Sequence, residues 1–431
     1  MSHKRFTNQS FLKYFENTSF LLVEKLLRMS IGLAVGIWLA KYLGPAQFGI
    51  LNYCISFVGL FMPIAMLGLD AVVVKKIINE KDNLNKILGT SFIMKLFGAF
   101  LAFVLIILSA TLFTSNTEKE SLIILIITLS LFFQSFNVID FFYQSEVKSK
   151  YTVYSSLFSL IISSALKIVF IYKELDLIYF VFLILLDSIL LTAGLLIYYR
   201  KRNFTIFSWR WNLKISKDLL SESWPLILSG ISFVIYNSVD KIMLRNILSD
   251  QAVGIYSAAS RLVVVWQFLP GLIVTSFLPS LIKAYNTNSE TFMKRLKYLS
   301  SFLLWFSIVL AIIYSVLSEF IMDITFGEKY TEASQLMVYL IWSNVLIFFN
   351  SVWNRWMLIK NNTKITLSFA LATSILNLIL NYFLINIFGV IGASLALLSS
   401  LLLSYFIFYI IIDFKVIRLF FSSLFLVYLK D

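Results

Sequence analysis

The sequence predicts an all-α integral membrane protein with about twelve transmembrane helices. Three observations lead to this fold class: 59% of the 431 residues are hydrophobic, only 14% are charged, and the apolar residues gather in long runs. A soluble domain normally has about a quarter charged residues. An apolar run of roughly 20 residues crosses the hydrocarbon core as a helix, because backbone polar groups in lipid must be paired within the segment.

In chain order the apolar runs are interpreted as twelve spans. The first run contains charged residues and is not followed by a small-residue cleavage site, so it is predicted to be a retained helix and not a signal peptide. Pro63 and Pro270 lie inside the second and eighth runs and predict kinks there. The spans are 20–41, 49–69, 90–113, 121–143, 151–172, 178–199, 223–245, 253–282, 298–318, 334–357, 365–386 and 391–412.

The distribution of basic residues supports this set of spans. With the N-terminus in the cytoplasm, the cytoplasmic segments contain 24 Lys and Arg residues, whereas the external segments contain only Lys41, Lys119, Lys173 and Lys329. Cytoplasmic segments of membrane proteins are enriched in Lys and Arg. An error in the number of spans would invert the asymmetry after that point. The chain is therefore predicted to have both termini in the cytoplasm, and its net charge of +13 reflects topology and anionic lipid headgroups, with no nucleic-acid partner.

The longest connection, the basic stretch Arg200–Lys217, predicts a division into two six-helix halves, 1–207 and 208–431. A faint repeat accompanies this division. The segment AQFGIL begins at Ala46 and the segment QAVGIY begins at Gln251, 205 positions later, and each opens a span with an internal proline. A duplicated transporter built from two similar bundles produces such a pattern.

Four short segments carry a family resemblance. YLGPAQFGILNY (Tyr42–Tyr53) followed by LGLD (Leu67–Asp70) resembles the start of the Wzx-type polysaccharide flippases of the multidrug/oligosaccharidyl-lipid/polysaccharide exporter superfamily. VDKIML followed by VGIYSAASRL (Val239–Leu262) is similar to the junction of helices seven and eight in that family, and FGEKYTEAS (Phe326–Ser334) to its external turn after helix nine. The usual acidic pair after Gly-Pro is replaced here by Ala46-Gln47.

The resemblance implies two six-helix bundles facing each other across a central cavity. It also implies that the chain moves an undecaprenyl-diphosphate-linked oligosaccharide from the cytoplasmic to the periplasmic leaflet of the bacterial inner (cytoplasmic) membrane, as in O-antigen, lipopolysaccharide or capsule assembly. Proton or sodium coupling would supply the energy. No cofactor is expected. The single cysteine (Cys54) and single histidine (His3) do not supply a Cys- or His-based metal site.

Ionisable residues inside the spans are the candidate functional residues, because a charge at mid-bilayer costs at least about 2.5–3.5 kcal/mol. Arg28 and Arg261 lie too deep for easy snorkelling, and we predict that they bind the substrate diphosphate. Lys25 adjoins Arg28, and Lys241 lies in the VDKIML motif, so both join the predicted substrate-binding set. The alternative for Arg28 is a structural ion pair with Glu24, four residues earlier. Near the span ends, long stems can carry charges to the headgroups; this applies to Lys95, Lys167, Arg245 and Arg355, and it is the alternative for Lys241.

Two acidic residues are candidates for ion pairing or coupling. Asp187 lies near mid-depth in the sixth span, where it could pair with Arg28 or Arg261 or bind a coupling cation, and Asp240 precedes Lys241. Polar residues suited to binding sugars also lie within spans, although each could equally bond between helices. They are Asn237, Ser257, Asn344, Asn350, Asn354 and Asn377.

Other functional classes fit less well. An enzyme of glycan assembly generally needs an acid or base in a polar site, often on a long external loop, and no such loop or in-span histidine is present. A multidrug or cation exporter of the same superfamily would favour an acidic pocket, whereas the mid-depth residues here are at least as basic as acidic. A lipid II-type flippase typically has two more helices. A scaffold without transport would not explain charges retained at mid-bilayer.

Overall fold

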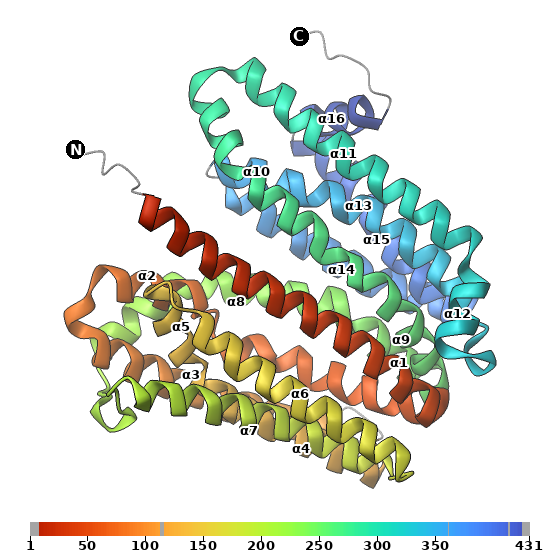
Figure 1. The fold of residues 1–431 in the computed structure, drawn as a ribbon. Coiled ribbons are helices and arrows are strands. Elements are labelled where there is room, and N and C mark those ends of the chain that lie inside the picture. The colour runs from red at the N-terminus through yellow and green to blue at the C-terminus, as the bar shows by residue number, and fades with distance from the viewer. Residues whose placement is uncertain (1–7, 113–115, 361, 413, 425–431) are drawn as a thin grey trace. The chain divides into compact units, whose positions relative to one another are not determined.

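The computed structural model describes residues 8–112, 116–360, 362–412 and 414–424, and within these residues every regular element is a helix (Figure 1). The first two predicted spans lie in one long helix, and each of the others corresponds to one helix or to two consecutive helices. The spans are formed by α1 (Asn8–Met66), α3 (Leu84–Leu112), α4 (Glu118–Gln134) with α5 (Val138–Ser145), α6 (Lys150–Tyr172), α7 (Leu177–Lys201), α8 (Leu213–Ile247), α9 (Asp250–Val264) with α10 (Phe268–Thr287), α11 (Ser289–Val316), α13 (Ala333–Ile359), α14 (Thr363–Phe388) and α15 (Val390–Ile412).

Helix α1 contains the first two spans. Its backbone leaves the helical region at Gly44, where φ is 70° and ψ is 172°. A glycine adopts this left-handed φ without a steric penalty, and Pro45 then begins the second helix with a φ suited to a first helical position. Among the described residues there are eleven candidate membrane spans, the first of which runs through this break. Counting its two helices separately gives the twelve spans that the sequence predicts.

The eighth span is also interrupted as predicted. Between α9 and α10 the chain forms a short 3-10 helix, η4 (Val265–Gln267), just before Pro270. Proline lacks a backbone N–H, and its ring clashes with the carbonyl four residues earlier, which here belongs to Trp266. The predicted kink near Pro270 is therefore confirmed.

Three short helices were not predicted from the apolar runs. They are α2 (Asp70–Asn79), α12 (Ser318–Phe326) and α16 (Phe414–Leu424), and each is shorter than a membrane span. The FGEKYTEAS segment begins at the end of α12. The chain turns at Gly327, where φ is 80°, and then forms the short 3-10 helix η5 (Glu328–Tyr330). This segment therefore connects the ninth and tenth spans, as the resemblance implies.

The chain folds into two compact units. Unit 1 comprises residues 1–42 and 54–234, and unit 2 comprises residues 43–53 and 235–431. The predicted division at 207/208 lies in the connection between α7 and α8, whereas the units divide within α8. Segment Leu43–Tyr53 precedes most of unit 1 in the sequence but packs within unit 2.

Unit 1 has a core where α2, α5, α7 and the start of α8 meet α3. Val73, Ile139, Phe142, Tyr199 and Leu219 are almost completely buried there. The basic connection after α7 is fixed to this core, because the Trp209 indole donates to the Tyr199 hydroxyl at 3.1 Å and the Arg210 N–H donates to the Asn85 carbonyl at 3.1 Å. Helices α6 and α7 pack along each other, and α4 packs along α7 (Figure 1).

Unit 2 is organised around α13. This helix packs against α9, α11 and α15, and α14 and α15 pack along each other as a hairpin (Figure 1). The hairpin turns at Gly389, where φ is 61°. Large side chains of α13, such as Phe349, Trp353 and Trp356, are almost completely buried. Polar side chains of α8, α9 and α14 meet within this unit.

Candidate functional site

In unit 1 the structure places Arg28 in a network of charged and polar side chains. Its Nε lies 2.9 Å from the Glu24 Oε1, and its Nη1 lies 4.0 Å from the Asp187 Oδ2. The Nη2 donates to the Ser156 carbonyl at 3.1 Å and to the Ser156 hydroxyl, which itself donates to Glu24. We call Glu24, Arg28, Ser156 and Asp187 the Arg28 cluster.

The Asp187 carboxylate also accepts hydrogen bonds from helix α6. Its Oδ1 accepts hydrogen bonds from the hydroxyls of Ser159 at 2.6 Å and Ser163 at 3.2 Å, both on α6. Serines 156, 159 and 163 follow the three- and four-residue spacing of one helix face. This spacing was the sequence signal for the cluster, and our sequence analysis did not use it.

The Arg28 cluster contains an ion pair, but it is open. The Arg28 side chain retains 38% of its accessible surface and Asp187 retains 33%, so the two charges are not sealed in a core. The structure therefore contains the i, i+4 pair with Glu24 that was the alternative for Arg28, and also the pairing of Asp187 with Arg28. Lys25 lies beside the cluster on α1 and is exposed.

In unit 2 the structure places Asp240 in a different setting. Its carboxylate is 2% exposed and accepts hydrogen bonds from the Tyr256 hydroxyl at 2.5 Å and from the Asn381 Nδ2 at 2.7 Å. The Asn381 Nδ2 also donates to the Asn377 carbonyl and side-chain oxygens, one turn away on α14. We call Asp240, Tyr256, Asn377 and Asn381 the Asp240 cluster.

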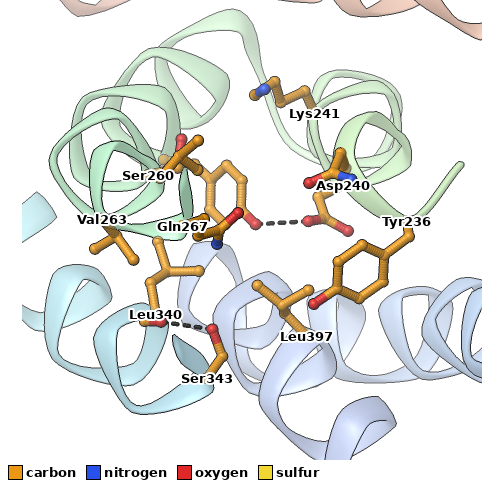
Figure 2. Close-up of a pocket in the computed structure, with 12 residues that line it drawn as sticks. Tyr236, Asp240, Lys241, Ser260, Val263, Gln267, Leu340, Ser343 and Leu397 are labelled. Atoms are coloured by element: carbon orange, nitrogen blue, oxygen red, sulfur yellow. Dashed lines mark hydrogen bonds between the residues drawn. The ribbon is translucent and has the colours of Figure 1, made fainter. Parts of the chain in front are cut away.

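A small pocket with both polar and apolar lining adjoins the Asp240 cluster, as Figure 2 shows. The Tyr236 hydroxyl, the Gln267 amide and the Ser343 hydroxyl line it together with Asp240 and Tyr256. Lys241 belongs to the same lining, with its ammonium turned away from the Asp240 carboxylate (Figure 2). Helices α8, α9, α13 and α15 and the 3-10 helix η4 supply the lining side chains and therefore fix the pocket.

The predicted binding residues of unit 2 lie within range of one another. Lys241 interacts electrostatically with both Asp240 and Arg261. The Arg261 guanidinium lies over the Phe48 ring, 5.8 Å from its centroid. Of the seven predicted residues, Glu24, Arg28 and Asp187 thus gather in unit 1, and Asp240, Lys241 and Arg261 gather in unit 2.

The prediction for Lys95 was wrong. The sequence predicted that its stem would carry the charge to the headgroups, but the side chain is 1% exposed, and its Nζ lies 4.9 Å from the centroid of the Phe141 ring. Asp70 and Asp140 lie within electrostatic range. Helix α3 begins at Leu84, so Lys95 lies three turns inside it and faces α5, where Phe141 and Asp140 stabilise its charge.

Sequence reasoning missed several members of the two clusters. Tyr256 and Gln267 were not singled out, because a lone tyrosine or glutamine in an apolar span is not distinctive. Asn377 was listed as a polar residue, but its partner Asn381, four residues later on the same face, was not. An i, i+4 pair of amides in a span was therefore an available signal for the Asp240 cluster.

The spans and the ionisable clusters inside them define a multi-pass membrane protein. A family model described as "Polysaccharide biosynthesis protein" matches residues 14–285, well over half of the chain. The chain therefore belongs to the polysaccharide biosynthesis protein family, and the resemblance inferred from its motifs is confirmed. A second family model, described as MatE, matches residues 225–383.

Two curated relatives are similar to part of the chain. The probable low-salt glycan biosynthesis flippase Agl15 of Haloferax volcanii is 24% identical over 188 residues, which cover 43% of this chain and 39% of the relative. The capsular polysaccharide biosynthesis protein CapF of Staphylococcus aureus is 22% identical over 205 residues, which cover 46% of this chain and 51% of the relative. The chain therefore matches about half of the length of these relatives or less.

Solved structures share the fold over nearly the whole chain. An inward-facing multidrug resistance MATE family transporter of the MOP superfamily has a TM-score of 0.73 at 14% identity and covers 94% of this chain and 99% of its own. The lipid II flippase MurJ, in an inward closed conformation, has a TM-score of 0.71 at 17% identity and covers 95% of this chain and 93% of its own. The predicted all-helical membrane fold is therefore confirmed.

Proposed function

We propose that the chain is a flippase that moves a lipid-linked oligosaccharide across the bacterial inner membrane by alternating access. The carrier is undecaprenyl diphosphate, the direction is from the cytoplasmic to the external leaflet, and both chain termini lie in the cytoplasm. Membership of the polysaccharide biosynthesis family and the names of the two curated relatives support the substrate class. The basic residues of the connections support the orientation.

The open Arg28 cluster carries this proposal. A diphosphate is costly to desolvate, and a guanidinium offers it two parallel hydrogen bonds that remain charged at every physiological pH. Arg28 is inside a span, yet 38% of its side chain is accessible. In the empty protein Glu24 and Asp187 compensate its charge. Phosphate oxygens can replace these carboxylates without leaving a buried charge unpaired.

Lys241 and Arg261 would supply a second group of positive charges in unit 2. Both lie near the pocket that Asp240, Tyr236 and Gln267 line. Amide and aromatic side chains of this kind bind sugar hydroxyls and ring faces. We assign this group to the headgroup of the substrate, together with Lys25 and Arg28.

Asp240 is the residue that we propose for coupling to a proton or sodium gradient. Its carboxylate is buried, and its hydrogen-bond partners, Tyr256 and Asn381, are neutral donors. A buried carboxylate stabilised in this way gains from acquiring either a proton or a small cation, because each lowers the cost of a negative charge in a low-dielectric site. The Asn377 side-chain oxygen lies in the same cluster and is a suitable cation ligand.

The proposed cycle makes and breaks no covalent bond, so we propose that the protein is not an enzyme. A multidrug or cation exporter is the second candidate, because the MatE model matches residues 225–383, which include the Asp240 cluster. A lipid II-type flippase is a third candidate, supported by the fold shared with MurJ. These candidates differ in cargo and can be separated in one reconstituted system.

The test is translocation of a diphosphate-linked glycolipid in proteoliposomes by the wild type, Arg28→Ala and Arg261→Ala. We expect the wild type to move the lipid and Arg28→Ala to lose about tenfold to a hundredfold of the rate, the effect of a lost charge-assisted contact of about 1.5–3 kcal/mol. Arg210→Ala, at an exposed position outside the spans, is the matched control. Folded variants that keep the wild-type rate would remove the arginines from the site. A wild type that exports small cations but not the lipid would establish the exporter instead.

A further inference from the structure

The connection between α7 and α8 carries exposed aromatic side chains among basic ones. Residues 200–217 include six Lys and Arg residues and no Asp or Glu. Of the six, Arg202 is paired with Glu146, and the other five are exposed. Phe207 is 92% exposed and Trp211 is 45% exposed. We call residues 200–217 the basic–aromatic connection.

The basic–aromatic connection is fixed against the start of α3. The Arg210 N–H donates to the Asn85 carbonyl at 3.1 Å. A Cβ atom added to Gly89 would lie 2.5 Å from the Arg210 backbone nitrogen, so the two backbones are in direct contact. Phe207 lies in the short 3-10 helix η3 (Ile206–Ser208), just before this contact. Its exposure is therefore set by an ordered backbone that packs on unit 1.

The aromatic side chains of the connection alternate between core and surface. The Trp209 indole donates to the Tyr199 hydroxyl at 3.1 Å, and its ring lies 5.3 Å from the Phe92 ring. Phe207 and Trp211, two positions before and after it, lie on the surface. The core therefore takes one of these three aromatic side chains, and the other two face outward. Exposed apolar groups rimmed by polar ones mark sites of interaction with a membrane or a protein.

The position and charge of the connection favour a lipid surface. It joins the ends of two spans, α7 and α8, and the distribution of basic residues predicts that it lies on the cytoplasmic side. Aromatic side chains at span ends lie at the level of the lipid headgroups, and anionic headgroups attract basic segments beside them. Two separate rings flanked by cations do not form the continuous apolar centre that is typical of a protein interface.

We propose that the basic–aromatic connection binds anionic phospholipids of the cytoplasmic leaflet. The Phe207 and Trp211 rings enter the headgroup region, and the exposed cations, Lys214 and Lys217 among them, bind lipid phosphates. Because α7 and α8 both end here, this contact sets the depth of one end of unit 1 in the bilayer. The inference does not depend on the cargo of the protein, so a failure of the transport experiment leaves it untouched.

The experiment measures how closely lipid acyl chains approach Phe207. Phe207→Cys carries a fluorophore in a Cys54→Ala background, where the new thiol is the only one in the chain. The protein is reconstituted into bilayers in which a nitroxide quencher is attached to the acyl chain of either phosphatidylglycerol or phosphatidylcholine, at equal fractions. Asp82→Cys is the matched control. Asp82 is exposed and lies in another 3-10 helix of unit 1, η1 (Lys81–Asn83), where residues 79–86 include no aromatic residue.

We expect phosphatidylglycerol to quench the fluorophore at position 207 roughly threefold more efficiently than phosphatidylcholine, because the cations gather anionic lipid around the ring. Quenching at position 82 should be weak with both lipids. Quenching at 207 that is no stronger than at 82 would overturn the proposal and would leave the exposed rings to a protein partner. Equal quenching by the two lipids at 207 would also overturn it, because the cations would then not select the lipid.

A second pair of variants tests the charges directly. Lys214→Gln combined with Lys217→Gln should lose most of the preference for phosphatidylglycerol at position 207, and high salt should have the same effect on the parent protein. Lys119→Gln combined with Lys173→Gln removes two exposed lysines on the predicted external side and should keep the preference. All four side chains are exposed, so their replacement leaves the core intact. An equal loss in both double variants would overturn the assignment of the charges to this connection.

Discussion

The two ionisable clusters differ in how each carboxylate is stabilised. In unit 1, Asp187 faces a guanidinium and two hydroxyls, and the ion pair retains about a third of its accessible surface. In unit 2, Asp240 is 2% exposed, and a phenol and an amide donate to it. Both residues lie inside membrane spans, and they differ in their partners and in their exposure.

This difference suggests that the two clusters have different functions. An open ion pair already balances its charge and can exchange one anionic partner for another at little cost. A buried carboxylate whose hydrogen-bond donors are neutral is stabilised when it binds a proton or a cation. The Arg28 cluster therefore fits an exchangeable anion, and the Asp240 cluster fits a coupling ion.

The largest effect is expected for neutralisation of the two carboxylates. Asp240→Asn should abolish the response of translocation to an imposed proton or sodium gradient, because an amide has no charge for the ion to balance. Asp187→Asn should retain the response, since its role is in the Arg28 ion pair. The measurement is the ratio of glycolipid translocation with and without each gradient in proteoliposomes. A response that survives Asp240→Asn and disappears in Asp187→Asn would reverse the assignment.

A smaller effect is expected at Glu24, where removal of the charge should strengthen substrate binding. This carboxylate competes with an incoming phosphate for Arg28, because both bind the same guanidinium. Glu24→Gln should therefore tighten binding of a diphosphate-linked glycolipid by roughly threefold to tenfold, a coupling of about 1 kcal/mol. Glu16→Gln, at an exposed position on the same helix, is the control. Weaker binding in the Glu24 variant would mean that the glutamate positions Arg28 and does not compete for it.

The clusters should also differ in their contribution to stability. Tyr256→Phe removes a hydrogen bond to a buried carboxylate and should cost about 1.5–3 kcal/mol. Ser159→Ala should cost about 0.5–1.5 kcal/mol, since Asp187 keeps Ser163 and Arg28 as partners. Tyr405→Phe is a matched control, because its hydroxyl donates to the neutral Leu346 carbonyl. Unfolding in detergent measures the three changes, and equal losses for Tyr256 and Ser159 would contradict the contrast.

The fold followed from the sequence to a large extent. Apolar run length and the positions of Lys and Arg are sufficient to place twelve spans, because lipid forces each span to be a helix. The break in the first helix at Gly44 and the interruption before Pro270 also have local causes in the sequence. The short helices α2, α12 and α16 were missed because they do not cross the membrane and have no run of the required length.

The sites were less predictable. Depth identified Arg28, Asp187 and Asp240 as candidates, but the partners of each residue depend on which helix faces pack together. In a span that is apolar on all faces, hydrophobic periodicity does not identify those faces. Lys95 illustrates the limit: its distance from the end of the span suggested a snorkelling side chain, whereas its contact with Phe141 depends on how α3 and α5 pack.

The smallest effect on stability is expected for a Glu–Arg ion pair outside the spans. This pair can be compared with the pair of Glu24 and Arg28, which lies inside a span. Glu146 lies in the connection between α5 and α6, where its Oε2 accepts hydrogen bonds from Arg202 at 2.7 Å and Lys148 at 3.0 Å. Partial burial raises the pKa of this carboxyl, but the two cationic donors outweigh it and hold the pKa below its ordinary value of 4.5. A depressed folded-state pKa gives stability that is present above the ordinary value and is lost as the pH falls through the lower one.

Glu146→Gln should therefore be less stable than the wild type at neutral pH by at most about 1 kcal/mol, because exposed ion pairs are screened by water and salt. The difference should shrink as the pH falls below 4.5, where the wild-type carboxyl takes up its proton. Thermal unfolding of both proteins in detergent across that range is the measurement, with Glu290→Gln, at an exposed position, as the control. A difference that stays constant with pH would show that packing, and not charge, stabilises the residue.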